Sequence, residues 1–220
     1  MPTITAFCRV SLLCLGLSLP GMLWAAPPDQ VIGNFGQADL AGWQEKEFSG
    51  NTVYTLEDSP AGKVLHAASR AAASGLFKEV SVDLTRTPYL HWSWRVDATF
   101  KGNDERSKAG DDYPARVYVV VSGGLLFWRT RAVNYVWSSN QAVDSAWPNA
   151  FTDHAQMIAV RSGAADTGRW LHERRNVRED LQRLFGADIA HIDAVAVMTD
   201  SDNTGQAASA DYGDIYFSAQ

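Results

Sequence analysis

Tyr89-Leu-His-Trp-Ser-Trp-Arg-Val-Asp97 is a stretch in which large apolar side chains occupy every second position. Successive side chains of a β-strand point to opposite sides, so this period of two predicts a strand with one face towards a core. The core face carries Leu90, Trp92, Trp94 and Val96, and the other face carries Tyr89, His91, Ser93, Arg95 and Asp97. The second face is either open to solvent or lines a groove.

Similar short segments, rich in aromatic and β-branched residues, recur along the chain and are separated by Gly, Asn, Asp and Pro. The predicted strands are 31–35, 43–48, 52–57, 63–68, 74–82, 89–96, 115–122, 133–138, 156–161, 170–175, 193–200 and 214–218. Short strands at regular spacing are typical of a sandwich built from antiparallel sheets. The sequence therefore predicts an all-β fold, mainly antiparallel, of the β-sandwich or jelly-roll type.

One segment breaks the alternation. Val177-Arg-Glu-Asp-Leu-Gln-Arg-Leu-Phe-Gly186 places its apolar residues at helical spacing. Asn176 is a favourable residue before the first turn of a helix, and Gly186 is a favourable residue after the last. We predict a short amphipathic helix near 177–186 that packs its apolar stripe against one end of the sandwich.

The N-terminus has the pattern of an export signal, with Arg9, an apolar run over 10–24 and the small residues Ala25 and Ala26. We predict a signal peptide at 1–25 and a single β-sandwich domain at 26–220, located in the periplasm or secreted. Both cysteines, Cys8 and Cys14, fall within the signal, so the mature chain would contain no disulfide. After signal removal, no apolar run in the sequence is long enough to span a membrane.

The charge of the chain and its lack of common catalytic motifs argue against several classes of function. The formal net charge is −6 and the arginines are scattered among acids, which argues against nucleic acid as a partner. The sequence contains no G-x-S-x-G, no H-E-x-x-H, no phosphate loop and no dinucleotide fingerprint. Whether the chain is an enzyme stays uncertain on this basis, and the oligomeric state stays open.

Two strands carry polar groups on the face away from the predicted core. If 89–96 and 115–122 pair, Arg95, Arg116 and Tyr118 come together, a combination suited to carboxylates or sugar hydroxyls. The alternative is an internal network in which Arg116 pairs with Asp111 or Asp112 and holds the polar loop 101–114, which is itself either a functional loop or a solvated one. The candidate ligand-binding residues are His91, Arg95, Asp111, Asp112, Arg116, Tyr118, Tyr135 and Trp137, the last two as stacking platforms for a sugar.

The acidic stretch from Asp200 to Asp211 partly matches the calcium-loop template D-x-[DN]-x-[DN]-G-x5-E. Thr204 stands where a carboxylate or amide is expected, and strands flank the loop where the template has helices. A β-sandwich can still build a calcium site from loop oxygens, so the candidate ligands are Asp200, Asp202, Asn203 and Asp211. The alternative is that these side chains accept hydrogen bonds from amides of their own turn.

Several segments resemble a bacterial exported family of unknown function. They are Asp111-Asp-Tyr-Pro-Ala-Arg-Val-Tyr-Val119, Tyr135-Val-Trp137, Arg175-Asn-Val177, Asp200-Ser-Asp-Asn-Thr-Gly205 and Tyr212-Gly-Asp-Ile-Tyr-Phe217. The opening segment Phe35 to Trp43 and the closing segment Gly213-Asp-Ile-Tyr-Phe217 are also similar to the first and last strands of galactose-binding-like jelly rolls. That second resemblance implies carbohydrate binding and a structural calcium.

We therefore expect an exported envelope protein that binds a glycan or another polar ligand and is not an enzyme. One alternative is a carbohydrate-active enzyme, a polysaccharide hydrolase or lyase, that uses the 101–114 loop with His91 and Asp112. A second alternative is a structural domain that contacts another protein.

Overall fold

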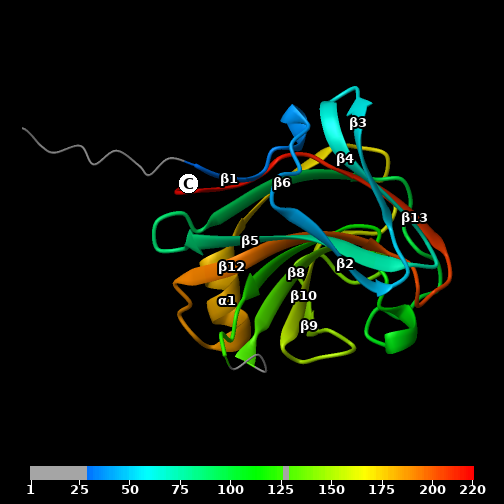
Figure 1. Cartoon of the computed structure of the whole chain (residues 1–220). Helices are drawn as coiled ribbons and strands as arrows, with labels where there is room; N and C mark the ends of the chain where they lie inside the picture. The colour runs from blue at the N-terminus through cyan, green and yellow to red at the C-terminus, as the bar shows by residue number, and fades with distance from the viewer. Residues whose placement is uncertain (1–28, 126–128) are drawn as a thin grey trace, which may run out of the picture.

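Two seven-stranded sheets face each other in the computed structural model, which describes residues 29–125 and 129–220 (Figure 1). The predicted signal peptide lies outside the described residues. The first sheet has the order β1 (Gln30–Gly33), β14 (Ile215–Ser218), β6 (Tyr89–Val96), β13 (Ala207–Tyr212), β4 (Gly62–Arg70) and β3 (Val53–Ser59), with β11 (Leu171–Asn176) also paired to β6. The second has the order β2 (Trp43–Ser49), β5 (Ala73–Asp83), β12 (His191–Asp200), β7 (Arg116–Val121), β8 (Arg131–Ser138), β10 (Ala155–Ser162) and β9 (Ala146–Pro148).

The prediction of an all-β, mainly antiparallel sandwich of the jelly-roll type is confirmed. Adjacent strands run antiparallel except β10 and β8, which are parallel. Each predicted strand exists within a few residues of its expected bounds. The sequence reading missed two strands, β9 and β13. β13 begins Ala-Ala-Ser-Ala, and small side chains of this kind give little β propensity.

The core lies between the sheets and is rich in aromatic rings. Leu90, Trp92, Trp94 and Val96 of β6 are at most 2% exposed, as the alternation predicts. The ring of Trp92 packs on Tyr135 at 5.4 Å between centroids, and that of Trp94 packs on Trp137 at 6.0 Å.

Tyr135 and Trp137 are fully buried, so their prediction as sugar-stacking platforms is wrong. They do share one face of β8, as expected, but that face is the core face. A period of two assigns residues to two faces and does not say which face meets the other sheet.

The helix α1 (Val177–Phe185) is confirmed together with both of its ends. The side chain of Asn176 accepts a hydrogen bond from the amide of Glu179 at 3.2 Å, and Gly186 adopts a left-handed φ of 66°. Val177 and Leu181 are fully buried against the core. Within the part of the chain that the structure describes, no helix is long and apolar enough to cross a membrane.

β6 and β7 follow one another in sequence but belong to different sheets. β6 pairs with β11, β13 and β14, whereas β7 pairs with β12 and β8. The expected pairing of these two strands, and with it the meeting of Arg95 with Arg116, is therefore wrong. The connection between the two strands, residues 97–115, is long enough to carry the chain from one sheet to the other, and no local pattern reveals this crossing.

The 101–114 loop is more buried than its polar composition suggests. Glu105 and Asp112 are 0% exposed, and Tyr113 packs against Trp147 on the outer face of the second sheet. Both carboxylate oxygens of Glu105 accept hydrogen bonds, one from the Ser138 hydroxyl and one from the Ser139 amide. The charged groups of the loop can be buried because other segments supply their hydrogen-bond partners.

Candidate functional site

Arg116 is the centre of a buried polar network on the outer face of the second sheet. It lies opposite Met198 in the β7–β12 register, and Asp200 follows two residues later on the same face. The guanidinium donates from Nε to Asp200 Oδ1 at 2.8 Å, and its Nη2 donates to Asp200 Oδ2 and to the Asp111 carbonyl. Only 4% of Arg116 is exposed. This contact network ties the 101–114 loop to the end of β12.

Asp112 accepts hydrogen bonds from the amides of the acidic turn, a role predicted from the sequence for the side chains of that turn. Its carboxylate accepts hydrogen bonds from the amide of Thr204 at 2.6 Å and from the amide and side chain of Asn203 at 3.2 Å. The two neighbouring aspartates, Asp111 and Asp112, therefore bind different segments of the chain.

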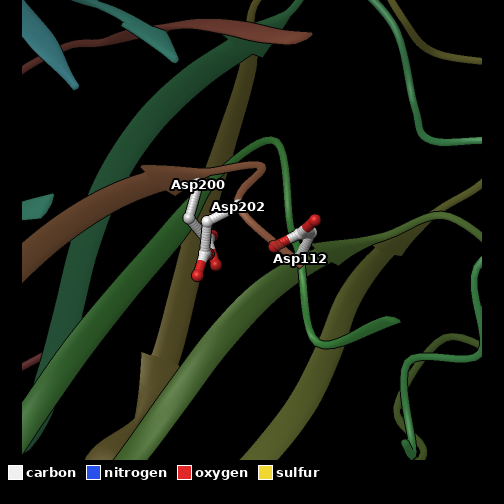
Figure 2. A group of neighbouring side chains, drawn as sticks. All are labelled: Asp112, Asp200 and Asp202. Carbon is white, nitrogen blue, oxygen red and sulfur yellow. The ribbon is translucent and has the colours of Figure 1, made fainter. Parts of the chain in front are cut away.

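Three carboxylates meet beside this turn. Figure 2 shows Asp200 and Asp202 side by side, with Asp112 approaching from the separate 101–114 loop, and one oxygen of each lies within 4.8 Å of the others. Asp211 is absent from this described group. It lies on β13 in the first sheet, where it contacts His66 Nδ1 at 2.7 Å and Arg95 Nη1 at 2.9 Å. The prediction of Asp211 as a fourth ligand beside Asp200, Asp202 and Asn203 is corrected accordingly.

The electrostatics of the group are dominated by burial. Removal from water raises the pKa of Asp200 to about 8, and the carboxylates of Asp112 and Asp111 add to this effect while Arg116 opposes it. Burial also raises the pKa of Asp111 and that of Asp202. Asp111, Asp112, Asp200 and Asp202 lie near the single guanidinium of Arg116 in this network. The excess of acidic groups favours a protonated Asp200.

A hard cation would relieve the same excess of negative charge. Calcium takes six to eight oxygen ligands, and carboxylates are the preferred donors. Asp112 and Asp202 offer such oxygens, whereas Asp200 would share its oxygens with the guanidinium of Arg116. Calcium binding therefore stays a prediction, with Asp112 replacing Asp211 among the candidate ligands.

A cleft of about 480 Å³ opens above this network, and we call it the Arg116 cleft. The half-buried side chain of Tyr118 lines it beside Arg116. Two phenylalanines of the same lining, Phe48 and Phe151, are 55% and 56% exposed. Hydrogen-bonding side chains are provided by Asn134, Asn149, Thr152, Asp202 and Asn203.

Two acceptor atoms of the cleft lining are buried without a donor among the described residues. They are Oδ1 of Asn134 and Oδ1 of Asp111. An unpaired buried acceptor costs about 1 to 3 kcal/mol, so a donor supplied by solvent or by a ligand hydroxyl would be favourable here. The lining thus combines exposed rings with unsatisfied polar groups.

The remaining candidates lie on the opposite face of the sandwich. His91 and Arg95 occupy the outer face of β6, where His91 stacks on Tyr216 at 4.6 Å and Arg95 pairs with Asp97 and Asp211. Burial lowers the pKa of His91. His91 lies on β6 of the first sheet and Asp112 lies in the loop before β7 of the second sheet, so the structure does not bring together the pair expected for a hydrolase or lyase.

The eight candidate ligand-binding residues thus separate into three places. Asp111, Asp112, Arg116 and Tyr118 come together at the second sheet, His91 and Arg95 lie across the first sheet, and Tyr135 and Trp137 lie in the core. Phe48, Asn149 and Phe151 were not identified from the sequence, because a phenylalanine or an asparagine near a predicted turn has no distinctive pattern there.

Solved structures similar to this chain share little sequence with it. A family 11 carbohydrate-binding module from Clostridium thermocellum, in complex with a β-1,3-1,4-mixed-linked tetrasaccharide, is 8% identical, with a TM-score of 0.46 over 86% of this chain and 94% of that chain. The xyloglucanase domain of NopAA, a type three effector from Sinorhizobium fredii, is 9% identical, with a TM-score of 0.45 over 89% of this chain and 100% of that chain.

The cellulose induced protein Cip1 is 8% identical, with a TM-score of 0.47 over 83% of this chain and 93% of that chain. No curated protein matches the sequence. The model of one protein family matches residues 41–216, which is most of the chain. The chain belongs to that family, which is described as "Protein of unknown function (DUF3047)".

Proposed function

We propose that the chain binds a neutral glycan segment in the Arg116 cleft, without catalysis. The observation that carries this proposal is the composition of the cleft, where the exposed rings of Phe48 and Phe151 accompany the hydrogen-bonding groups of Asn149, Asp202 and Asn203. A cavity of about 480 Å³ is within the usual range for ligand pockets.

The two kinds of group suit the two kinds of surface on a sugar. Aromatic rings supply rigid apolar area at a low entropic cost, and they fit the apolar face of a pyranose. Amide and carboxylate side chains fix hydroxyls by hydrogen bonds, which give specificity. Asn134 Oδ1 and Asp111 Oδ1, which lack donors among the described residues, would gain from a hydroxyl brought within reach.

The charge of the site favours a neutral glycan over an acidic one. Asp111, Asp112, Asp200 and Asp202 gather around the single guanidinium of Arg116. A uronate or sulfated sugar would be repelled by this excess of carboxylates. The Nε and Nη2 of Arg116 already donate to Asp200 and Asp111. The role of Arg116 in binding is therefore to hold the 101–114 loop in position.

The test is isothermal titration of the mature chain with neutral hexasaccharides of glucose, galactose and N-acetylglucosamine. Phe48→Ala and Phe151→Ala should each weaken binding about tenfold, since a stacking ring contributes on the order of 1 kcal/mol. Val53→Ala, which removes an equally exposed apolar side chain from β3 of the first sheet, is the matched control and should leave affinity unchanged. Equal affinity in the wild type and in all three variants would show that the glycan does not bind in the Arg116 cleft.

Export is a further part of the proposal. The arginine, apolar run and small residues of 1–26 support delivery to the periplasm or to the outside of the cell, where envelope and environmental glycans are found. Fractionation of cells that express the full chain tests this, and an uncleaved cytoplasmic product would contradict it.

A further inference from the structure

A second groove crosses the outer face of the first sheet, on the side of the sandwich opposite the Arg116 cleft. It consists of two cavities of about 640 and 520 Å³, and both are lined by Trp170 and Val64. Each volume falls within the range of ligand pockets. We call the two cavities together the Trp170 groove.

The alternation of β6 places the polar residues of this groove. His91 and Ser93 line one cavity and Arg95 lines the other, because every second side chain of the strand faces away from the core. Gly213 lets the hydroxyl of Ser93 approach the backbone of the neighbouring segment closely. A Cβ atom at Gly213 would overlap the hydroxyl of Ser93 and lie 3.7 Å from the Trp170 ring. The groove floor therefore depends on a residue without a side chain.

Aromatic surface and hydrogen-bonding groups alternate along the groove. At one end Tyr216 stacks on His91, with 4.6 Å between centroids and 1° between ring planes. The half-buried ring of Trp170 lies between the two cavities. At the far end Arg95 Nη1 donates to Asp211 Oδ2 at 2.9 Å, which fixes the direction of that guanidinium.

We propose that the Trp170 groove is a second glycan site, which takes a neutral oligosaccharide across Tyr216 and Trp170. Two rings with polar groups around them match a chain of pyranoses, which presents apolar faces edged by hydroxyls. The site shares no described lining residue with the Arg116 cleft, so the inference does not rest on the function proposed for the cleft.

Charge selects the class of oligosaccharide. The lining carries the acidic residues Glu57, Asp58, Asp211 and Asp214, together with Glu173. The basic residues of the lining are Lys63 and Arg95, and each is paired with one of these acids, Asp58 and Asp211 respectively. Glu173 is paired with Arg161, which leaves the negative charge of Glu57 and Asp214 to oppose a polyuronate.

The experiment is isothermal titration of the mature chain with neutral hexasaccharides of glucose, galactose and N-acetylglucosamine, with hexagalacturonate as the acidic comparison. Trp170→Ala should weaken binding of at least one neutral hexasaccharide by about tenfold, as expected for loss of a central aromatic contact. Ala61→Trp provides a second variant, because Ala61 is exposed at the groove and a large ring there fills the space without removing a packed side chain.

The variants of the two sites serve as controls for each other. Binding that Trp170→Ala and Ala61→Trp weaken, and that Phe48→Ala and Phe151→Ala leave unchanged, supports the groove even when the cleft binds nothing. The groove is refuted when no neutral hexasaccharide binds, when binding depends only on the phenylalanines, or when hexagalacturonate binds the groove more tightly than every neutral hexasaccharide. For a hexasaccharide that binds at two sites per chain, each set of variants should weaken one site about tenfold and leave the other at its wild-type affinity.

Discussion

Arg116 and Asp200 form a buried ion pair between residues 84 positions apart, with Nε donating to Oδ1 at 2.8 Å. Arg116 is 4% exposed and Asp200 is 1% exposed, so each depends on the other for hydrogen bonds, and Arg116 depends also on the Asp111 carbonyl. The pair joins the start of β7 to the end of β12, where the acidic turn begins. Its main effect is to fix the wall of the Arg116 cleft.

Replacement of Arg116 by Gln should lower the free energy of unfolding by about 3 to 5 kcal/mol, because the buried oxygens of Asp200 and of the Asp111 carbonyl lose their donor. Urea denaturation followed by circular dichroism measures this. The control is Arg169→Gln, since Arg169 forms an exposed pair with Asp166 that should contribute about 0 to 1 kcal/mol. Equal effects of the two substitutions would show that the Arg116 pair is not a structural requirement.

Stability should fall as pH rises from about 4 to about 8, between the unfolded and the folded pKa of Asp200. The pKa of Asp200 is about 8 in the folded chain and near 3.8 when unfolded, so the folded state binds the proton more tightly. This contribution to stability is complete below the unfolded pKa and is lost as pH rises through the folded pKa. Thermal unfolding across this pH range measures the trend. Asp200→Asn should flatten the profile and the exposed-site control Asp58→Asn should not. A wild-type stability that rises between about pH 4 and pH 8 would contradict the prediction.

Calcium should raise the melting temperature of the wild-type chain, because an ion that binds only the folded state stabilises it by mass action. The site expected from the sequence now depends on Asp112, Asp200 and Asp202. Asp202→Asn removes one ligand and leaves the Arg116–Asp200 pair in place, so this variant should lose the response. Melting curves in chelator and in added calcium provide the measurement. An unchanged wild-type midpoint would mean that these carboxylates only form hydrogen bonds and ion pairs within the protein.

Tyr135→Phe should destabilise the fold and leave glycan binding unchanged. The Tyr135 hydroxyl donates to Oδ2 of the buried Asp180 at 3.1 Å, and loss of a hydrogen bond to a charged group costs about 1.5 to 3 kcal/mol. Urea denaturation and hexasaccharide titration of the same variant separate the two effects. Weaker binding at unchanged stability would restore Tyr135 as a ligand contact.

The parts of the fold that sequence predicts are those set by local pattern. The strand Tyr89–Val96 follows from alternation, and α1 follows from the apolar spacing together with Asn176 and Gly186 at its ends. Long-range arrangement is not encoded in such patterns. Neither the separation of β6 from β7 nor the burial of Tyr135 and Trp137 is visible in the spacing of residues.

The candidate site was predicted in part for the same reason. Arg116, Tyr118 and the neighbouring aspartates are close in sequence, and they remain close in the structure. Asp112 joins Asp200 and Asp202 because the start of β7 lies beside the end of β12, whereas Asp211 leaves them because β13 crosses to the first sheet. Sheet pairing over long sequence distances decided both outcomes.

The anchoring of the 101–114 loop has a consequence for the kinetics of binding. Glu105 accepts hydrogen bonds from Ser138 and Ser139, and the Asp111 carbonyl accepts one from Arg116. The carboxylate of Asp112 accepts hydrogen bonds from the amides of the 203–204 turn. A loop fixed at three points does not have to close over an arriving ligand. Association should therefore proceed in a single step whose rate rises linearly with ligand concentration, with no ordering of the loop to slow it.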